Sequence, residues 1–146
     1  MEEEDMYLHI NSEQSREYYP DNTPSHFHVV LDDYINFAEY RLGALLDFTC
    51  STNKFKGEGG GGLKEIYIDT NFTEEQLVGG RWQNLLRYCT VKRDKFQVDR
   101  FELPYYVPFK PIRSNTLEII IRDVDGQVAS FLEEVTKCTF HFKKRR

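Results

Sequence analysis

Alternating apolar and polar positions run through most of the chain, and the clearest case lies near its C-terminal end. Residues 116–123 read TLEIIIRD, so a leucine and two isoleucines fall on one face of an extended chain and a glutamate and an arginine on the other. Residues 138–143, CTFHFK, repeat the alternation. The pattern predicts two strands. Residues 124–134 between them are too many for a two-residue hairpin, so the connection is either a wide loop or a crossing between sheets.

The same alternation elsewhere brings the expected number of strands to eight. The six earlier strands are predicted at residues 6–11, 26–32, 38–50, 63–69, 85–92 and 96–101. The sequence also allows a helical turn capped by Asp32 or Asp33 and a short helix after Thr73. Prolines within residues 103–111 confine that extended segment to a sheet edge or to strand ends.

Composition supports a single β domain over residues 1–146. A globule of this length can bury about 70% of its unfolded surface, which is enough for a core without cross-links. Aromatic residues make up 14% of the chain, with eleven Phe and nine Tyr against two Met, and rings pack well on a pleated surface. We therefore expect an all-β fold.

Three cysteines, Cys50, Cys89 and Cys138, stand within apolar runs and show no C-x-x-C spacing. An odd number without metal-ligand spacing favours reduced core thiols over disulfides or a zinc site. The acidic N-terminus lacks the basic and apolar regions of a secretory signal, and no stretch is long enough to span a membrane. We expect an intracellular protein, at least when it is synthesised, without a membrane partner.

Charge is divided unevenly along the chain. Residues 1–50 hold eleven acidic and two basic side chains, a balance of −9, whereas residues 51–146 hold thirteen acidic and seventeen basic ones, a balance of +4. Such a split suggests opposed patches or a self-complementary assembly rather than a general nucleic-acid binder. Two solvated halves without a partner are the alternative.

Candidate metal and catalytic motifs are weak. His26 and His28 share a strand face at metal-ligand spacing, but the sequence places no third ligand beside them. Residues 123–134 hold two aspartates, a glycine and a glutamate that mimic the ends of a calcium loop, yet the glycine is misplaced and an ordinary Asp-Gly turn is favoured. The glycine-rich residues 57–62 lack the Gly-Lys-Ser/Thr of a phosphate-binding loop.

No serine or cysteine has a credible base beside it in the sequence, and no carboxylate pair stands out. We therefore predict that the protein is not an enzyme and that it uses no cofactor, metal or small-molecule substrate. Leu77–Gly80 resembles the cleavage pattern of adenovirus-type proteases, a short match that leaves processing open.

Two features point to macromolecular partners. The paired aromatics Tyr18 with Tyr19 and Tyr105 with Tyr106 stand next to or near prolines in extended segments, and such side chains often anchor interfaces, although core packing explains them too.

The chain ends in four cations, Lys143, Lys144, Arg145 and Arg146. They could contact nucleic-acid phosphates or an internal protein, or serve only as a soluble end.

Five segments in order resemble the minor capsid, or penton, jelly-roll proteins of Maverick/Polinton elements and adintoviruses. The opening strand is followed by an aromatic-Pro-Asp-Asn turn, and the C-terminal signature is the most similar part. The matching residues are Met6–Ser12 with Tyr19–Ser25, Ile66–Asp69, Gln76–Gly79 with Leu85–Arg87, Tyr106–Pro108, and Thr116–Arg122 with Asp125, Gly126 and Thr139–Phe142.

This resemblance implies one jelly-roll β-sandwich of eight strands in two four-stranded antiparallel sheets. The last two strands then belong to opposite sheets, with residues 117 and 140 facing each other across the core. It also implies a homopentamer at the vertex of a virion that contacts a major capsid protein and, through the basic end, the genome. Basic patches at Arg93, Lys95, Arg100 and Arg113 would oppose the acidic first third. The alternative is a cellular or host-domesticated β-sandwich binding module.

Overall fold

The computed structural model describes residues 5–53 and 63–144, which form an all-β fold. Its elements in chain order are β1 (Met6–Asn11), β2 (His26–Asn36), the 3-10 helix η1 (Phe37–Glu39), β3 (Tyr40–Thr52), β4 (Leu63–Thr70), β5 (Gln76–Val78), β6 (Arg81–Gln83), β7 (Leu85–Lys92), β8 (Lys95–Arg100), β9 (Val107–Pro108), β10 (Arg113–Arg122) and β11 (Leu132–Lys144). Within these ranges, no helix has the length and apolar character needed to cross a membrane.

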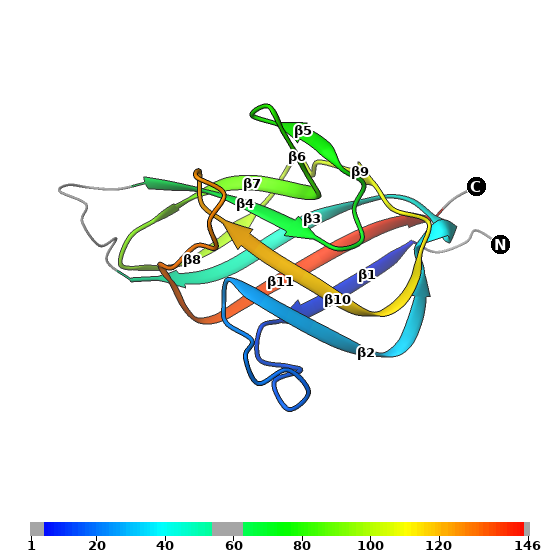
Figure 1. Ribbon diagram of the computed structural model, residues 1–146, viewed down its shortest axis with the longest axis horizontal. Helices are drawn as coiled ribbons and strands as arrows, with labels where there is room; N and C mark the ends of the chain where they lie inside the picture. Colours follow the sequence, from blue (N-terminus) through cyan, green and yellow to red (C-terminus); the bar gives the residue numbers. More distant parts are fainter. Residues whose placement is uncertain (1–4, 54–62, 145–146) are drawn as a thin grey trace.

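Two antiparallel sheets make up the body of the molecule. One has the order β1-β11-β3-β8, with β9 added along β3, and the other has the order β2-β10-β4-β7. In Figure 1 the strands of the second sheet cross in front of those of the first, and the β5–β6 hairpin stands apart at the top. One core cluster draws its buried side chains from both sheets.

The two C-terminal strands lie in different sheets, as predicted. β10 pairs with β2 and β4, whereas β11 pairs with β1 and β3. Leu117 and Phe140 are both fully buried in the shared core. Residues 123–131 therefore form a crossing between sheets rather than a hairpin loop, and β11 begins within the predicted connection, at Leu132. The turn at the start of the crossing is the expected Asp-Gly turn, since the Gly126 N–H donates to the Asp123 carbonyl at 3.0 Å and Gly126 has a φ of 84°.

The expected number of strands is too low, because the described residues hold eleven strands in three sheets. The three additional strands have only two or three residues each, too short to show an alternation. Two of them form the β5–β6 hairpin, whose turn is Gly79–Gly80, and both glycines have positive φ (55° and 83°). A Gly-Gly pair is a known signal for a tight hairpin turn, so the sequence did indicate this hairpin.

Both helix expectations need correction. No helix follows Thr73, because its buried hydroxyl donates to the Asn84 carbonyl at 2.8 Å and fastens an irregular segment to the sheet. Before β3 there is a helical turn, η1, but its cap is Asn36 and not Asp32 or Asp33. The strand simply continues through those aspartates. The glycine-rich residues 57–62 lie outside the described ranges.

The three cysteines are free thiols, as predicted, with Cys50 and Cys138 buried and Cys89 half-buried. Burial raises the pKa of both Cys50 and Cys89 to about 12, with a smaller contribution from Asp99. It raises the pKa of Cys138 as well. Thiols that stay protonated at neutral pH are poor nucleophiles and poor metal ligands.

Five phenylalanines pack between the sheets at one end of the core: Phe37, Phe72, Phe109, Phe140 and Phe142. Phe72 stacks on Phe37 with ring centroids 4.9 Å apart. It also meets Phe109 edge-on at 5.5 Å and Phe140 edge-on at 6.0 Å. The cluster joins η1, β11 and the segments beside β4 and β9, so residues distant in sequence share one packing unit.

Replacing Phe72 by alanine should lower the free energy of unfolding by about 3–5 kcal/mol, because it leaves a cavity among four other rings. The matched control is Phe96→Ala, whose ring is 66% exposed and should cost less than about 0.5 kcal/mol. Urea unfolding followed by circular dichroism of the β-sheet signal measures both. Equal losses of stability in the two variants would contradict this description of the core.

Candidate functional site

Loop 12–25 covers the outer edge of β2 and presents the first tyrosine pair. Tyr18 is 66% exposed, while Tyr19 is partly buried and stacks on His28 with ring centroids 4.6 Å apart. The Asn22 side chain pairs with both backbone groups of His28. The His28 N–H donates to Asn22 Oδ1, and Asn22 Nδ2 donates to the His28 carbonyl, each at 2.9 Å. The loop is therefore fixed to the strand.

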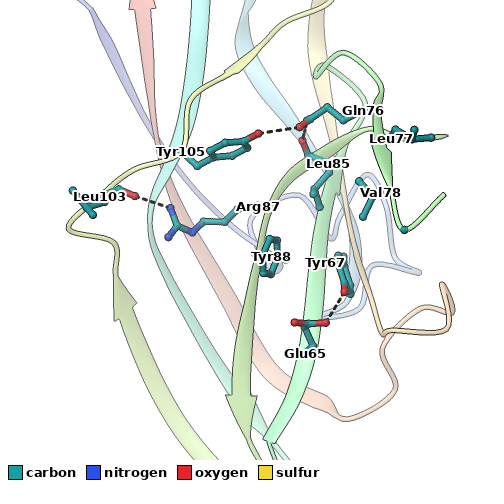
Figure 2. A pocket seen from close by; sticks show the side chains of 11 residues that line it. Glu65, Tyr67, Gln76, Leu77, Val78, Leu85, Arg87, Tyr88, Leu103 and Tyr105 are labelled. Carbon is teal, nitrogen blue, oxygen red and sulfur yellow. Dashed lines mark hydrogen bonds between the residues drawn. The ribbon is translucent and has the colours of Figure 1, made fainter. Parts of the chain in front are cut away.

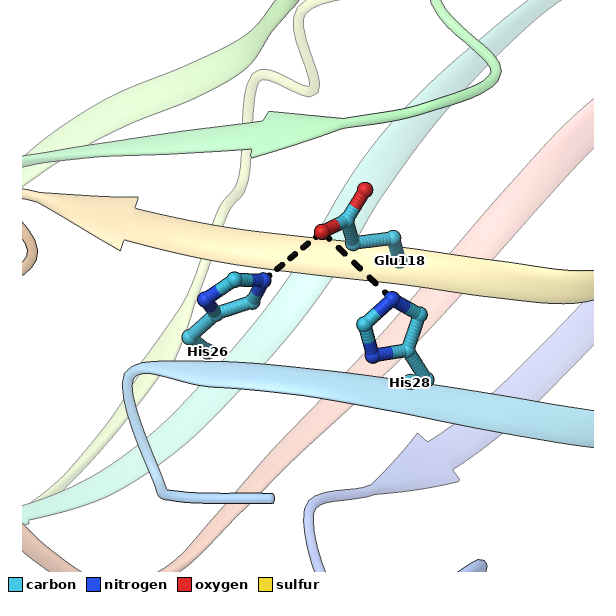
Figure 3. Close-up of side chains that lie close together, drawn as sticks. All are labelled: His26, His28 and Glu118. Atoms are coloured by element: carbon cyan, nitrogen blue, oxygen red, sulfur yellow. Dashed lines mark hydrogen bonds and ion pairs between the residues drawn. The ribbon is translucent and has the colours of Figure 1, made fainter. Parts of the chain in front are cut away.

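Next to this loop, His26, His28 and Glu118 converge on the outer face of the second sheet (Figure 3). Glu118 Oε2 lies 2.7 Å from His26 Nε2 and 3.5 Å from His28 Nε2. The sequence indicated the two histidines but not the carboxylate. Glu118 is 92 residues from His26 along the chain, and only the β2–β10 register places it directly opposite His28.

The second tyrosine pair, Tyr105 and Tyr106, lies away from loop 12–25, and its two side chains have different surroundings. Tyr105 is exposed and lines a groove, where its hydroxyl donates to Gln76 Oε1 at 3.5 Å. Tyr106 is half-buried, and its hydroxyl lies 2.8 Å from His141 Nδ1. The structure therefore does not unite the four tyrosines in one surface.

The groove occupies about 830 Å³ over the β4–β7 edge, with the β5–β6 hairpin above it (Figure 2). Tyr67 and Tyr88 lie beside each other along it, with ring centroids 5.9 Å apart. Its polar groups include Arg87 and Glu65, and the Glu65 carboxylate accepts a hydrogen bond from Tyr67, which raises the pKa of that phenol. Aromatic faces beside one cation and one anion suit a partner that offers both apolar and polar groups.

Leu77–Gly80 forms part of the hairpin above this groove. Leu77 is 63% exposed, and both glycines of the turn are exposed. The segment is accessible on the surface, although it belongs to a paired strand and its turn.

His141 belongs to a hydrogen-bonded cluster next to Lys143, whose ammonium lies over the Tyr106 ring. Asp5 Oδ2 lies 3.1 Å from His141 Nε2, and the Tyr7 ring stacks on the imidazole at 4.7 Å. Burial raises the pKa of Tyr106, with smaller contributions from Tyr7 and Asp5, so the phenol stays protonated. This Tyr–His–Asp arrangement is therefore unsuited to supply a phenolate nucleophile.

Two of the four terminal cations, Lys143 and Lys144, contact other side chains of the fold. Lys143 Nζ lies 4.0 Å from the centre of the Tyr106 ring, and Lys144 Nζ lies 3.8 Å from Glu39 Oε1. Both residues also belong to β11. Arg145 and Arg146 lie outside the described residues. A nucleic-acid role would therefore draw on side chains that also stabilise the strand.

A partly buried ion pair lies at the C-terminal end of β4. Arg122 Nε donates to Asp69 Oδ2 at 3.1 Å, and Asp69 is only 6% exposed. Among the described residues, its second oxygen has no hydrogen-bond partner. Burial raises the pKa of Asp69, although Arg122 opposes the shift.

No protein-family model matches the chain, and no curated protein matches it either.

The raised pKa of Asp69 predicts a pH dependence of stability. The folded state holds the proton more tightly than the unfolded state, so wild type should lose stability relative to Asp69→Asn as the pH rises above 3.8, the ordinary value. The loss should level off once the pH exceeds the folded pKa, at about 1.4 kcal/mol for each pH unit between the two pKa values. Urea unfolding of both proteins from pH 4 to 7 tests this. A constant difference, or one that grows in favour of wild type, would contradict it.

Proposed function

We propose that this protein is a jelly-roll structural protein of the viral capsid type, most specifically a vertex-forming minor capsid protein. The strand order supports the jelly roll. With the three short strands set aside, the eight long strands in chain order fall as 1-8-3-6 in one sheet and 2-7-4-5 in the other. Two interlocked Greek keys produce this order, and capsid domains are a common use of it.

Fold alone does not establish function, so the proposal also depends on the surface. A large bulge distorts β2 without ending it: the register passes from Ile35 to Val30 while β10 advances only from Ser114 to Thr116. The residues that bulge outward include the exposed Asp32, Asp33 and Tyr34. They form an acidic protrusion with an aromatic ring, which we call the acidic bulge.

The opposite flank of the sandwich exposes positive charges that could pair with the acidic bulge. Strand β8 ends its sheet and exposes Lys95 and Arg100 together with the apolar Phe96 and Val98. It lies beside the edge strand β7, because Gln97 Oε1 accepts from the Lys92 N–H at 3.0 Å. β2 is at the other edge of the β7 sheet.

The acidic bulge and β8 are therefore on opposite flanks, so contact between them in neighbouring copies would be head-to-tail. Head-to-tail contacts produce closed rings when the rotation between copies closes. Exposed apolar side chains between opposite charges are typical of an interface core with a polar rim. The acidic bulge on one flank and the basic, partly apolar β8 on the other are the observation that supports a homo-oligomeric ring. Arg113 does not belong to the basic flank, because its guanidinium lies over Tyr34, 4.3 Å from the ring centre, at the acidic bulge.

The groove over β4 and β7 favours a second candidate, a β-sandwich binding module of cellular or host-domesticated origin. Its volume of about 830 Å³ falls within the range of small-molecule and cofactor sites. A capsid role would instead use this groove for a segment of the major capsid protein. The state of the protein in solution separates the two candidates, because a binding module has no need to assemble.

The ring proposal predicts self-association that weakens with salt. Sedimentation at high protein concentration should show oligomers at about 20 mM NaCl and mainly monomers at about 500 mM, because screening reduces attraction between opposite charges. Asp32→Lys with Asp33→Lys should abolish association, and adding Lys95→Glu with Arg100→Glu should restore it. Glu13→Lys with Glu17→Lys is the control of equal charge. A monomer under every condition would overturn the proposal.

The basic end should bind DNA in a salt-dependent way. Replacing Lys143, Lys144, Arg145 and Arg146 by glutamine keeps the length of β11, which deletion would shorten. The slope of log K against log salt should become shallower by roughly 0.9 for each phosphate that the variant no longer neutralises. Gel-shift titration over a salt series measures it, with circular dichroism to confirm folding. An unchanged slope would exclude the basic end as the contact with the genome.

A further inference from the structure

We propose that His26, His28 and Glu118 form a zinc-binding site on the outer face of the second sheet. Nothing in the proposed capsid role requires a metal. Each of the three residues offers one ligand atom, and these atoms all lie within 4.8 Å of one another. Figure 3 shows the carboxylate between the two imidazoles.

The distances suit a zinc ion after a small movement. With zinc bonds of about 2.1 Å, two ligands of a tetrahedral site lie about 3.4 Å apart. Glu118 Oε2 and His28 Nε2 are already 3.5 Å apart, while Glu118 Oε2 and His26 Nε2 are 2.7 Å apart. The second pair needs to open by less than an ångström, and the two imidazole nitrogens, which lie within 4.8 Å of each other, need to approach. Side-chain torsions of the half-exposed His26 and Glu118 can supply both movements. The metal then replaces a hydrogen bond.

Backbone pairing fixes where the ligands stand. His26 and His28 alternate on one face of β2, and Glu118 of β10 is the cross-strand partner of His28. The Glu118 N–H donates to Asn71 Oδ1 at 2.9 Å, so its strand position is held from the other side as well.

His28 is the most firmly oriented of the three ligands. Asn22 binds its backbone through two hydrogen bonds, and the Tyr19 ring stacks on its imidazole. This ligand is organised before the metal arrives, because little of its side-chain freedom remains to be lost.

The donor set selects the class of metal. Two imidazole nitrogens and one carboxylate oxygen suit zinc and similar transition metals, whereas calcium and magnesium prefer sets made of oxygen. The side chains of His26, His28 and Glu118 are 39%, 32% and 28% exposed. Water can therefore reach the site and occupy the fourth position, as in zinc sites with three protein ligands.

Zinc titration of the untagged full chain by isothermal calorimetry tests the proposal. One ion should bind per chain, and His26→Gln, His28→Gln and Glu118→Gln should each weaken binding at least tenfold. The control is His9→Gln, an exposed histidine whose Nδ1 lies 3.1 Å from Thr139 Oγ1, well outside the cluster. It should bind zinc like wild type. Absence of saturable binding, or equal weakening in the control, would overturn the site.

Thermal unfolding provides a second readout that guards against misfolded variants. Excess zinc should raise the melting temperature of wild type and EDTA should reverse the rise, because a ligand that binds only the folded state stabilises it. Glu118→Gln should melt cooperatively but show no rise with zinc, and magnesium should have no effect on either protein. A rise of the same size in Glu118→Gln would refute the assignment. Because the stoichiometry is counted per chain, the result is independent of whether the protein assembles.

Discussion

Aromatic packing between the two sheets is the interaction on which the rest of this structure depends. Phe72 contacts four other phenylalanine rings, and these come from a helical turn, a C-terminal strand and an irregular segment. Edge-on and stacked rings add about 0.5–1.5 kcal/mol per pair beyond the area they bury. Space inside the cluster is limited, since a Cβ on Gly43 would stand only 2.0 Å from Phe109 Cζ.

Given that core, the sheets need protection at their edges, and side chains provide much of it. Asn22 pairs with the backbone of β2 as a neighbouring strand would, and Gln97 does the same for β7 by accepting from Lys92 and donating to the Thr90 carbonyl. Edges closed in this way resist uncontrolled pairing with other chains. In the proposed assembly, contacts between copies would therefore use side chains on the flanks, which is where the acidic bulge and the exposed residues of β8 lie.

The candidate sites differ in how they are built. The cluster around Glu118 arises from two adjacent strands in register, whereas the groove near Tyr105 needs a hairpin, a sheet edge and a loop to come together. Strand register is set by burial of one face and is therefore rigid. A metal site gains from that rigidity, while a groove bordered by a hairpin and a loop can adapt to a partner.

By itself, the sequence determined the all-β class, the free thiols and the inward faces of β10 and the end of β11, because burial of alternate residues leaves a period of two. It could not determine which strands pair, so Glu118 was not recognised as a neighbour of His26 and His28. It also could not separate Tyr105 from Tyr106, or place Arg113 beside Tyr34. Those relations follow from packing between residues far apart in the chain, and local alternation holds no information about them.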